Sequence, residues 1–288
     1  MVKELLNSNT PLLYKDPDYK KSIVNLDIET APSLGAYYDP YADNNIVWTE
    51  RYWIILCMGW KYPEESEVNF AAIWQMKGWK KVFCRCCRQI IPKRLYEAEE
   101  QLMYVLWPIL DEAKLVVGQN SDEFDIKRLN AKFIRYGFDP PSPYKTIDTK
   151  KEHKRIAKTD TNKLDDIADF YELGRKLETK KDLQKKVLQN DPAAQDEMER
   201  YNKQDVLLDE KLYFKERGWR KGRPYLNTIL GKITSCKNCG GEHFHKHGLD
   251  YDGLTIYQRY RCLGCGANLR GIPDRETKSG KAIERPIR

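Results

Sequence analysis

One short apolar run constrains this chain more than any other feature, because two acidic residues lie inside it. Residues 22–30 read Ser-Ile-Val-Asn-Leu-Asp-Ile-Glu-Thr, and the Ile, Val and Leu positions predict a buried strand. Side chains two apart in a strand point to the same face, so Asp27 and Glu29 project together, about 6.6 Å apart along the chain. Two such carboxylates on a half-buried face are costly unless a cation compensates them, and a divalent ion prefers hard oxygen ligands. A lone acidic pair is more often the solvated face of an edge strand, so the rest of the chain must decide between the two interpretations.

Two more acidic residues occupy positions beside or within apolar stripes. Residues 114–118 predict a short buried strand, and Asp125 follows in the first turn of the next predicted helix, beside its apolar stripe. Asp205 falls at the centre of the apolar stripe of the last long helix, one turn after Tyr201. Since an acidic residue is unexpected on a core-facing stripe, these positions favour a shared acidic site over a solvated strand.

The acidic positions resemble the signature of the DnaQ-like 3′–5′ exonucleases, in the DEDDy branch of the RNase H-like superfamily. The resemblance rests on Asp27-x-Glu29 in the first strand, Asn120-x-x-x-Phe124-Asp125 opening a helix, and Tyr201-x-x-x-Asp205 in the last helix. It covers residues 23–214. It implies an α/β fold, an RNase H-like mixed five-stranded sheet flanked by helices, with the first strand central.

The resemblance also implies a chemistry. Asp27, Glu29, Asp125 and Asp205 would hold two Mg²⁺ or Mn²⁺ ions, the arrangement that two-metal phosphodiester hydrolysis requires. Tyr201 would orient the attacking water, because a phenol with a reference pKa of about 10 is a poor base at neutral pH. The expected products are 5′-mononucleotides released from a 3′ end.

The substrate is less constrained than the chemistry. The resemblance implies that Asn120 and Phe124 shape the site near the terminal nucleotides, and the tyrosine branch favours single-stranded DNA. Two alternatives stay open. The enzyme could be a 3′–5′ exoribonuclease, or the chain could be a non-catalytic protein that binds nucleic acid or recruits a partner.

A second metal site is expected near the C-terminus. Cys236-x-x-Cys239 and Cys262-x-x-Cys265 are separated by 22 residues, a zinc-ribbon pattern in which four thiolates hold one structural Zn²⁺. The surrounding sequence resembles zinc ribbons of transposases and other DNA-handling proteins.

The charge distribution suggests what the ribbon contacts. The formal net charge is +7, and residues 216–288 carry 15 Lys and Arg against 7 Asp and Glu, which leaves residues 1–215 close to neutral. Tyr257, Arg259 and Arg261 alternate aromatic and cationic side chains, as nucleic-acid surfaces do, so we expect them to contact nucleic acid. A role in docking a replication or repair protein stays open.

A second cysteine group has no clear partner in the sequence. Cys84, Cys86 and Cys87 could bind metal or sense redox state, but no fourth ligand follows nearby. We interpret them as reduced thiols in a hairpin insertion.

The chain divides into five expected parts. These are an N-terminal arm (1–21), an exonuclease domain (22–215), a linker (216–231), the zinc ribbon (232–272) and a basic tail (273–288). No apolar run of about 18 residues predicts a membrane span, and no secretory signal opens the sequence. We therefore expect a cytoplasmic protein with no membrane partner, and the compact layout is similar to that of phage enzymes, which would act in the host cytoplasm.

Overall fold

The structure is a computed structural model and describes residues 22–37, 46–84, 86–87, 89–232, 234–252, 255–271 and 285–286. The expected arm (1–21) lies outside the described residues. So does the expected basic tail (273–288), apart from residues 285–286.

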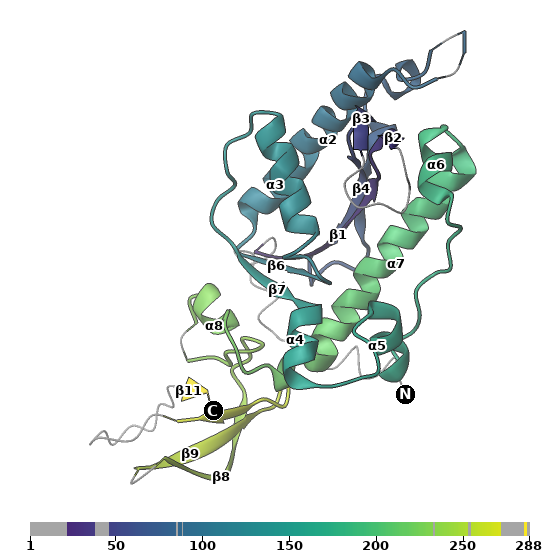
Figure 1. Cartoon of the computed structure of the whole chain (residues 1–288). Coiled ribbons are helices and arrows are strands. Elements are labelled where there is room, and N and C mark those ends of the chain that lie inside the picture. Colours follow the sequence, from purple (N-terminus) through teal and green to yellow (C-terminus); the bar gives the residue numbers. More distant parts are fainter. Residues whose placement is uncertain are drawn as a thin grey trace.

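A mixed five-stranded sheet organises the larger part of the chain (Figure 1), as the sequence predicts. Its strands are β1 (Ile23–Ala31), β4 (Ile54–Lys61), β5 (Asn69–Ala72), β6 (Leu115–Gly118) and β7 (Lys145–Asp148). The order is β5-β4-β1-β6-β7, with β1 antiparallel to β4 and parallel to β6. The strand with the two acidic residues is therefore central, which confirms the expected α/β class, the mixed five-stranded sheet and the central first strand.

Helices cover both faces of this sheet (Figure 1). On one side lie α2 (Pro92–Glu112) and α3 (Asp125–Arg135), and on the other lies α7 (Pro192–Glu216). The smaller helices are α4 (Thr149–Ile156), α5 (Leu164–Phe170) and α6 (Leu183–Leu188). Helix α7 begins at Pro192, because the Asp191 side chain accepts hydrogen bonds from the Ala193 and Ala194 amides and proline suits the first helical position.

The alternation of β1 sorts its side chains between the two helical layers. Val24, Leu26 and Ile28 belong to the main hydrophobic core. The intervening positions face α7: Asn25 Nδ2 donates to the Val206 carbonyl at 3.3 Å, and Ile23 belongs to a second apolar cluster that includes Tyr213 of α7. Since Asp27 and Glu29 share the parity of Ile23 and Asn25, they also face α7.

The segment between β1 and β4, for which the sequence analysis predicts no strand, contains a two-stranded sheet of β2 (Leu34–Tyr37) and β3 (Ile46–Arg51). Helix α4 follows β7 directly, because Asp148 ends the strand and its side chain accepts from the Lys151 amide at 3.1 Å.

The segment that follows α7 packs against the five-stranded sheet before the second sheet begins. After α7 come a 3-10 turn (Arg217–Trp219) and α8 (Leu226–Ile229), and Leu226 and Leu230 pack against the cluster that includes Leu115 of β6. A second sheet contains β8 (Phe244–Asp252), β9 (Thr255–Cys262), β10 (Asn268–Arg270) and β11 (Arg285–Pro286), in the order β11-β10-β9-β8. Among the helices of the described ranges, none combines the length and apolar character needed to cross a bilayer.

Candidate active site

Three of the four predicted acidic side chains meet between β1 and α7. One carboxylate oxygen each from Asp27, Glu29 and Asp205 lies within 4.8 Å of the other two. Asp27 and Glu29 are half-buried, whereas Asp205 is buried at the centre of α7. A strand of period two and a helix of period 3.6 therefore supply one all-oxygen cluster, the donor type that Mg²⁺ and Mn²⁺ prefer.

Asp125 lies beside the cluster but is held differently. It is buried in the first turn of α3, and its Oδ1 accepts a hydrogen bond from the Ile28 amide at 2.9 Å. Within the described residues it is not part of the group of three whose oxygens lie within 4.8 Å. Its charge still reaches the cluster, because it contributes to raising the pKa of Asp27. Asp125 is thus a neighbour of the three acids, with one oxygen already engaged by the sheet.

The carboxylates strongly oppose one another's ionisation. Burial, followed by Asp125, Glu29 and Asp205, raises the pKa of Asp27 well above its usual range. Burial and then Asp205 raise the pKa of Glu29 to about 8. Burial likewise raises the pKa of Asp125 to about 7. Without a bound metal ion the cluster therefore retains protons near neutral pH, and a divalent ion would relieve this repulsion.

A lysine that the sequence did not indicate enters the same cluster. Lys176 Nζ lies 2.6 Å from Asp205 Oδ2 and 3.5 Å from the Tyr201 hydroxyl. The other oxygen of Asp205, Oδ1, is buried and has no hydrogen-bond partner among the described residues. Burial and then the neighbouring Asp205 raise the pKa of Tyr201, so its phenol stays protonated. Lys176 lies in the irregular segment between α5 and α6, where no periodic pattern could have indicated it.

A second unpredicted residue fixes Asp27. The buried Asn202 side chain donates from Nδ2 to Asp27 Oδ2 at 2.7 Å and to the Asp27 carbonyl at 3.1 Å. Gly59 of β4 stands opposite Asp27 in the sheet, and a Cβ there would lie 2.5 Å from Asn202 Oδ1. The glycine therefore leaves the space that the asparagine occupies. In the sequence, only the position of Asn202 beside Tyr201 could have indicated a role at the site. A buried asparagine in a helix needs a polar partner, and here the partner is Asp27.

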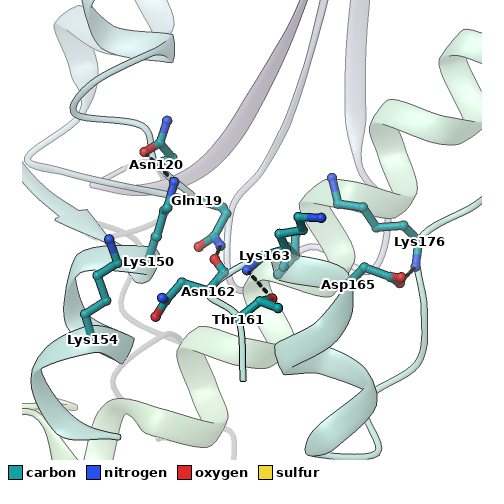
Figure 2. A pocket seen from close by; sticks show the side chains of 10 residues that line it. Gln119, Asn120, Lys150, Lys154, Thr161, Asn162, Lys163, Asp165 and Lys176 are labelled. Atoms are coloured by element: carbon teal, nitrogen blue, oxygen red, sulfur yellow. Dashed lines mark hydrogen bonds between the residues drawn. The ribbon is translucent and has the colours of Figure 1, made fainter. Parts of the chain in front are cut away.

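A lysine-rich pocket of about 610 Å³ (Figure 2) is linked to the cluster through Lys176, which lines the pocket and pairs with Asp205. Its cationic lining residues are Lys150 and Lys154 of α4, Lys163 and Lys176. Figure 2 shows the two α4 lysines at one side and Lys176 at the other. Amide side chains of Gln119, Asn120 and Asn162 complete much of the polar lining. Lys176 therefore belongs both to the acidic cluster and to this pocket.

The two predicted nucleotide contacts of this region have different surroundings. Asn120 lines the pocket and has left-handed backbone geometry (φ 59°), with its amide donating to Asp148 Oδ1 at 3.1 Å and its Oδ1 accepting from Lys150. Phe124 does not belong to the pocket lining, and its ring lies 4.9 Å from the Arg128 guanidinium carbon.

The four predicted zinc cysteines come together at the start of the second sheet. The Sγ atoms of Cys236 and Cys265 are 3.7 Å apart, and those of Cys239 and Cys262 are 3.6 Å apart. Sulfurs around a tetrahedral zinc with bonds of about 2.3 Å are separated by about 3.8 Å, so the four thiols could bind one Zn²⁺.

This cysteine cluster is attached firmly to the larger part of the chain. Arg217 Nη2 donates to the Gly264 carbonyl at 3.3 Å, and Asn238 Nδ2 donates to the Arg220 carbonyl at 3.0 Å. Arg220 is buried and pairs with Glu152 of α4 at 3.1 Å. The knuckles thus contact the segment that directly follows α7, and Arg220 links this segment to α4.

The three ribbon residues predicted to contact nucleic acid differ in their exposure and in their contacts within the protein. The half-buried ring of Tyr257 has the Arg270 guanidinium carbon 4.1 Å from its centroid. Arg259 donates from Nε to the His247 carbonyl at 3.2 Å. Arg261 is exposed.

Comparisons with known proteins give limited information about this site. No protein-family model matches the sequence, and no curated protein matches it. Among solved structures, the chain is similar to the family B DNA polymerase from the hyperthermophilic archaeon Pyrobaculum calidifontis, with a TM-score of 0.46 and 15% sequence identity. The match covers 82% of this chain but only 31% of the polymerase chain.

Proposed function

We propose that this chain is a metal-dependent 3′–5′ exonuclease that releases 5′-mononucleotides from single-stranded DNA. The observation that carries the proposal is the meeting of Asp27, Glu29 and Asp205 within 4.8 Å, with the Tyr201 hydroxyl close to the Lys176 that pairs with Asp205. The first strand of the sheet and the last long helix both contribute to this cluster, so the cluster is formed by the fold and not by acidic residues that are neighbours in the sequence.

The donor set fits divalent ions. It consists of carboxylate oxygens, includes the buried Oδ1 of Asp205 that has no partner among the described residues, and has pKa values that a cation would lower. Asp27, Glu29 and Asp205 would hold one ion, and Asp27 with Asp125 would hold the other. Two bound ions would supply an activated water and neutralise charge on the phosphate and the leaving oxygen.

The chain's own groups then have distinct tasks. Tyr201 keeps its proton, so it can donate a hydrogen bond that orients a water but cannot act as a base. Asn202 fixes the carboxylate of Asp27. Lys176 compensates Asp205, and its charge is also available to the phosphate of a strand that enters from the pocket.

The lysine-rich pocket is the path we propose for the strand. Phosphates carry one negative charge per nucleotide, and Lys150, Lys154 and Lys163 line a space that leads to Lys176 and Asp205. A pocket of about 610 Å³ has the size of a small-molecule site, so it has room for the terminal part of a flexible strand but not for a duplex, which favours single-stranded ends.

The zinc ribbon is proposed to add nucleic-acid affinity. Its exposed Arg261 and the excess of basic residues beyond position 216 support this role. Docking of a replication or repair protein is the competing outcome, and removal of ribbon charge separates the two. Loss of affinity for a bare oligonucleotide supports the first role, and unchanged affinity supports the second.

The test is degradation of end-labelled single- and double-stranded DNA and RNA with Mg²⁺, Mn²⁺ or EDTA. We expect a ladder from 5′-labelled single-stranded DNA and early release of mononucleotide from 3′-labelled strands, with no reaction in EDTA. Faster degradation of RNA would make the chain an exoribonuclease. No degradation of any substrate with either metal would contradict the proposal and favour a non-catalytic binding protein.

A further inference from the structure

Three thiols that have no role in the proposed exonuclease site lie close together in one loop. Cys84, Cys86 and Cys87 lie between the 3-10 turn Trp79–Lys81 and helix α2. A β-bridge between Phe83 and Ile90 closes the loop, and the Cys84 amide donates to the Gln89 carbonyl at 2.8 Å. The backbone thus returns on itself over a short segment and brings the cysteines together.

The geometry of the thiols goes beyond what sequence proximity requires. All three Sγ atoms lie within 4.8 Å of one another, and Cys84 Sγ is 2.9 Å from Cys86 Sγ. Alternate side chains of a turn can point apart at no cost, so convergence of the third sulfur is informative. A disulfide, with a bond of about 2.0 Å, would use only two of these sulfurs. A metal ion with bonds of about 2.3 Å would use all three.

Packing does not explain the convergence. Cys86 and Cys87 are exposed, whereas Cys57, the remaining cysteine outside the two clusters, is buried in the core. Exposed thiols gain little from burial, and three sulfurs in contact repel one another once they ionise. A thiophilic cation turns that repulsion into attraction. The four ribbon cysteines, with sulfurs 3.6 and 3.7 Å apart, are another thiol cluster in the same chain. The 2.9 Å between the Cys84 and Cys86 sulfurs would widen to about 3.8 Å around one zinc ion.

We propose that Cys84, Cys86 and Cys87 form a second thiophilic metal site that binds Zn²⁺ through three thiolates. On binding, each thiol releases its proton to solvent and donates a sulfur lone pair to the ion. Three protein ligands leave the fourth tetrahedral position open to water or to an external ligand. The ion in this exposed site therefore exchanges more readily than an ion held by four cysteines of the ribbon.

Binding would also fasten the loop. The cross-link spans residues 84–87 and adds to the bridge between Phe83 and Ile90 that closes the hairpin at its base. Trypsin cleaves after arginine, and Arg85 and Arg88 follow Cys84 and Cys87 in the sequence. Zinc should therefore slow tryptic cleavage in this segment, an effect that does not depend on any nuclease activity.

The decisive experiment counts zinc in the full-length chain. Protein is reduced, loaded with excess ZnCl₂, desalted and examined by native mass spectrometry, for the wild type, for C84S/C86S/C87S and for the control Cys57→Ala. We expect one more ion in the wild type and the control than in the triple variant, because all three proteins keep the carboxylate cluster and the four ribbon cysteines. A competing chelator should remove one ion from the wild type before the other, and zinc should slow cleavage after Arg85 and Arg88 only in the wild type and the control.

The same number of ions in the wild type and in the triple variant, whether one or two, would overturn the proposal. The single variant Cys86→Ser serves if the triple variant fails to fold, and it should lose the readily chelated ion. Because the result is a difference between variants, it does not depend on how many ions the ribbon holds.

Discussion

Replacing Glu29 by glutamine should stabilise the metal-free protein, although it removes a proposed metal ligand. Burial and then Asp205 raise the pKa of Glu29 from 4.5 to about 8. The unfolded chain releases this proton near pH 4.5, whereas the folded chain retains it up to about pH 8. The stability that the protonated Glu29 contributes is therefore complete below pH 4.5 and is lost as the pH rises through 8. The substitution Glu29→Gln avoids that loss, because the amide side chain stays neutral at every pH.

The size of the effect follows from the same values. The full shift corresponds to about 5 kcal/mol above pH 8. Glu29 is partly exposed and its charge interacts with those of Asp27 and Asp205, so we expect E29Q to be more stable than the wild type by about 2 kcal/mol in EDTA. The advantage should be smaller at about pH 6, where the wild type still keeps most of the proton.

Urea unfolding followed by circular dichroism measures this difference, in EDTA and in Mg²⁺. Mg²⁺ should stabilise the wild type strongly and E29Q weakly, which reverses or removes the order found in EDTA. Asp196→Asn is the matched control, because Asp196 is an acid on the helix that carries Asp205 but lies outside the cluster. If E29Q were no more stable than the wild type at high pH in EDTA, the repulsion that we infer among the acids would be absent.

Three further predictions concern neighbouring groups. Lys176→Met removes the cation beside Asp205, so it should lower the free energy of unfolding in EDTA by about 1–3 kcal/mol. It should increase the stabilisation by Mg²⁺, because the lysine no longer competes with the metal ion for Asp205. Equal Mg²⁺ shifts of the melting temperature in both proteins would refute this competition. Gly59→Ala should displace Asn202, whose Oδ1 would lie 2.5 Å from the new Cβ, and reduce Mg²⁺-dependent hydrolysis at least about tenfold while the circular dichroism spectrum stays native; unchanged kinetics would show that Asn202 does not fix the site. Lys150→Gln with Lys154→Gln should weaken binding of single-stranded oligonucleotides and reduce the salt slope by about 1.4, measured by fluorescence anisotropy in EDTA; an unchanged slope would remove the pocket from the proposed strand path.

Much of the acidic site follows from simple periodicity. The two-residue repeat of β1 required Asp27 and Glu29 to share a face, and they do face α7. The 3.6-residue repeat of α7 put Asp205 on the buried stripe, and it is buried at 2% exposure. Both predictions depend only on local geometry, which is why one strand and one helix sufficed.

The remaining features depend on tertiary contacts that no local pattern encodes. Lys176 reaches Asp205 from a segment without regular structure. Asn202 fits beside Asp27 because Gly59 of β4 has no side chain in that space. The sequence predicts Asp125 at a helix start, but the hydrogen bond from the Ile28 amide depends on how α3 meets β1. The convergence of Cys86 and Cys87 with Cys84 depends on the turn that the Phe83–Ile90 bridge closes.

The most direct test of the acidic centre compares three single variants in one assay. Wild type, Asp27→Asn, Asp205→Asn and the control Asp196→Asn are incubated with 5′-labelled single-stranded DNA and Mg²⁺ under single-turnover conditions. We expect stepwise shortening from the 3′ end by the wild type and the control, and loss of at least about 10³-fold in rate for both site variants, whose circular dichroism spectra stay native. Asp27→Asn or Asp205→Asn protein that shortened the strand at the wild-type rate would contradict the assignment of these acids to a metal-dependent exonuclease site.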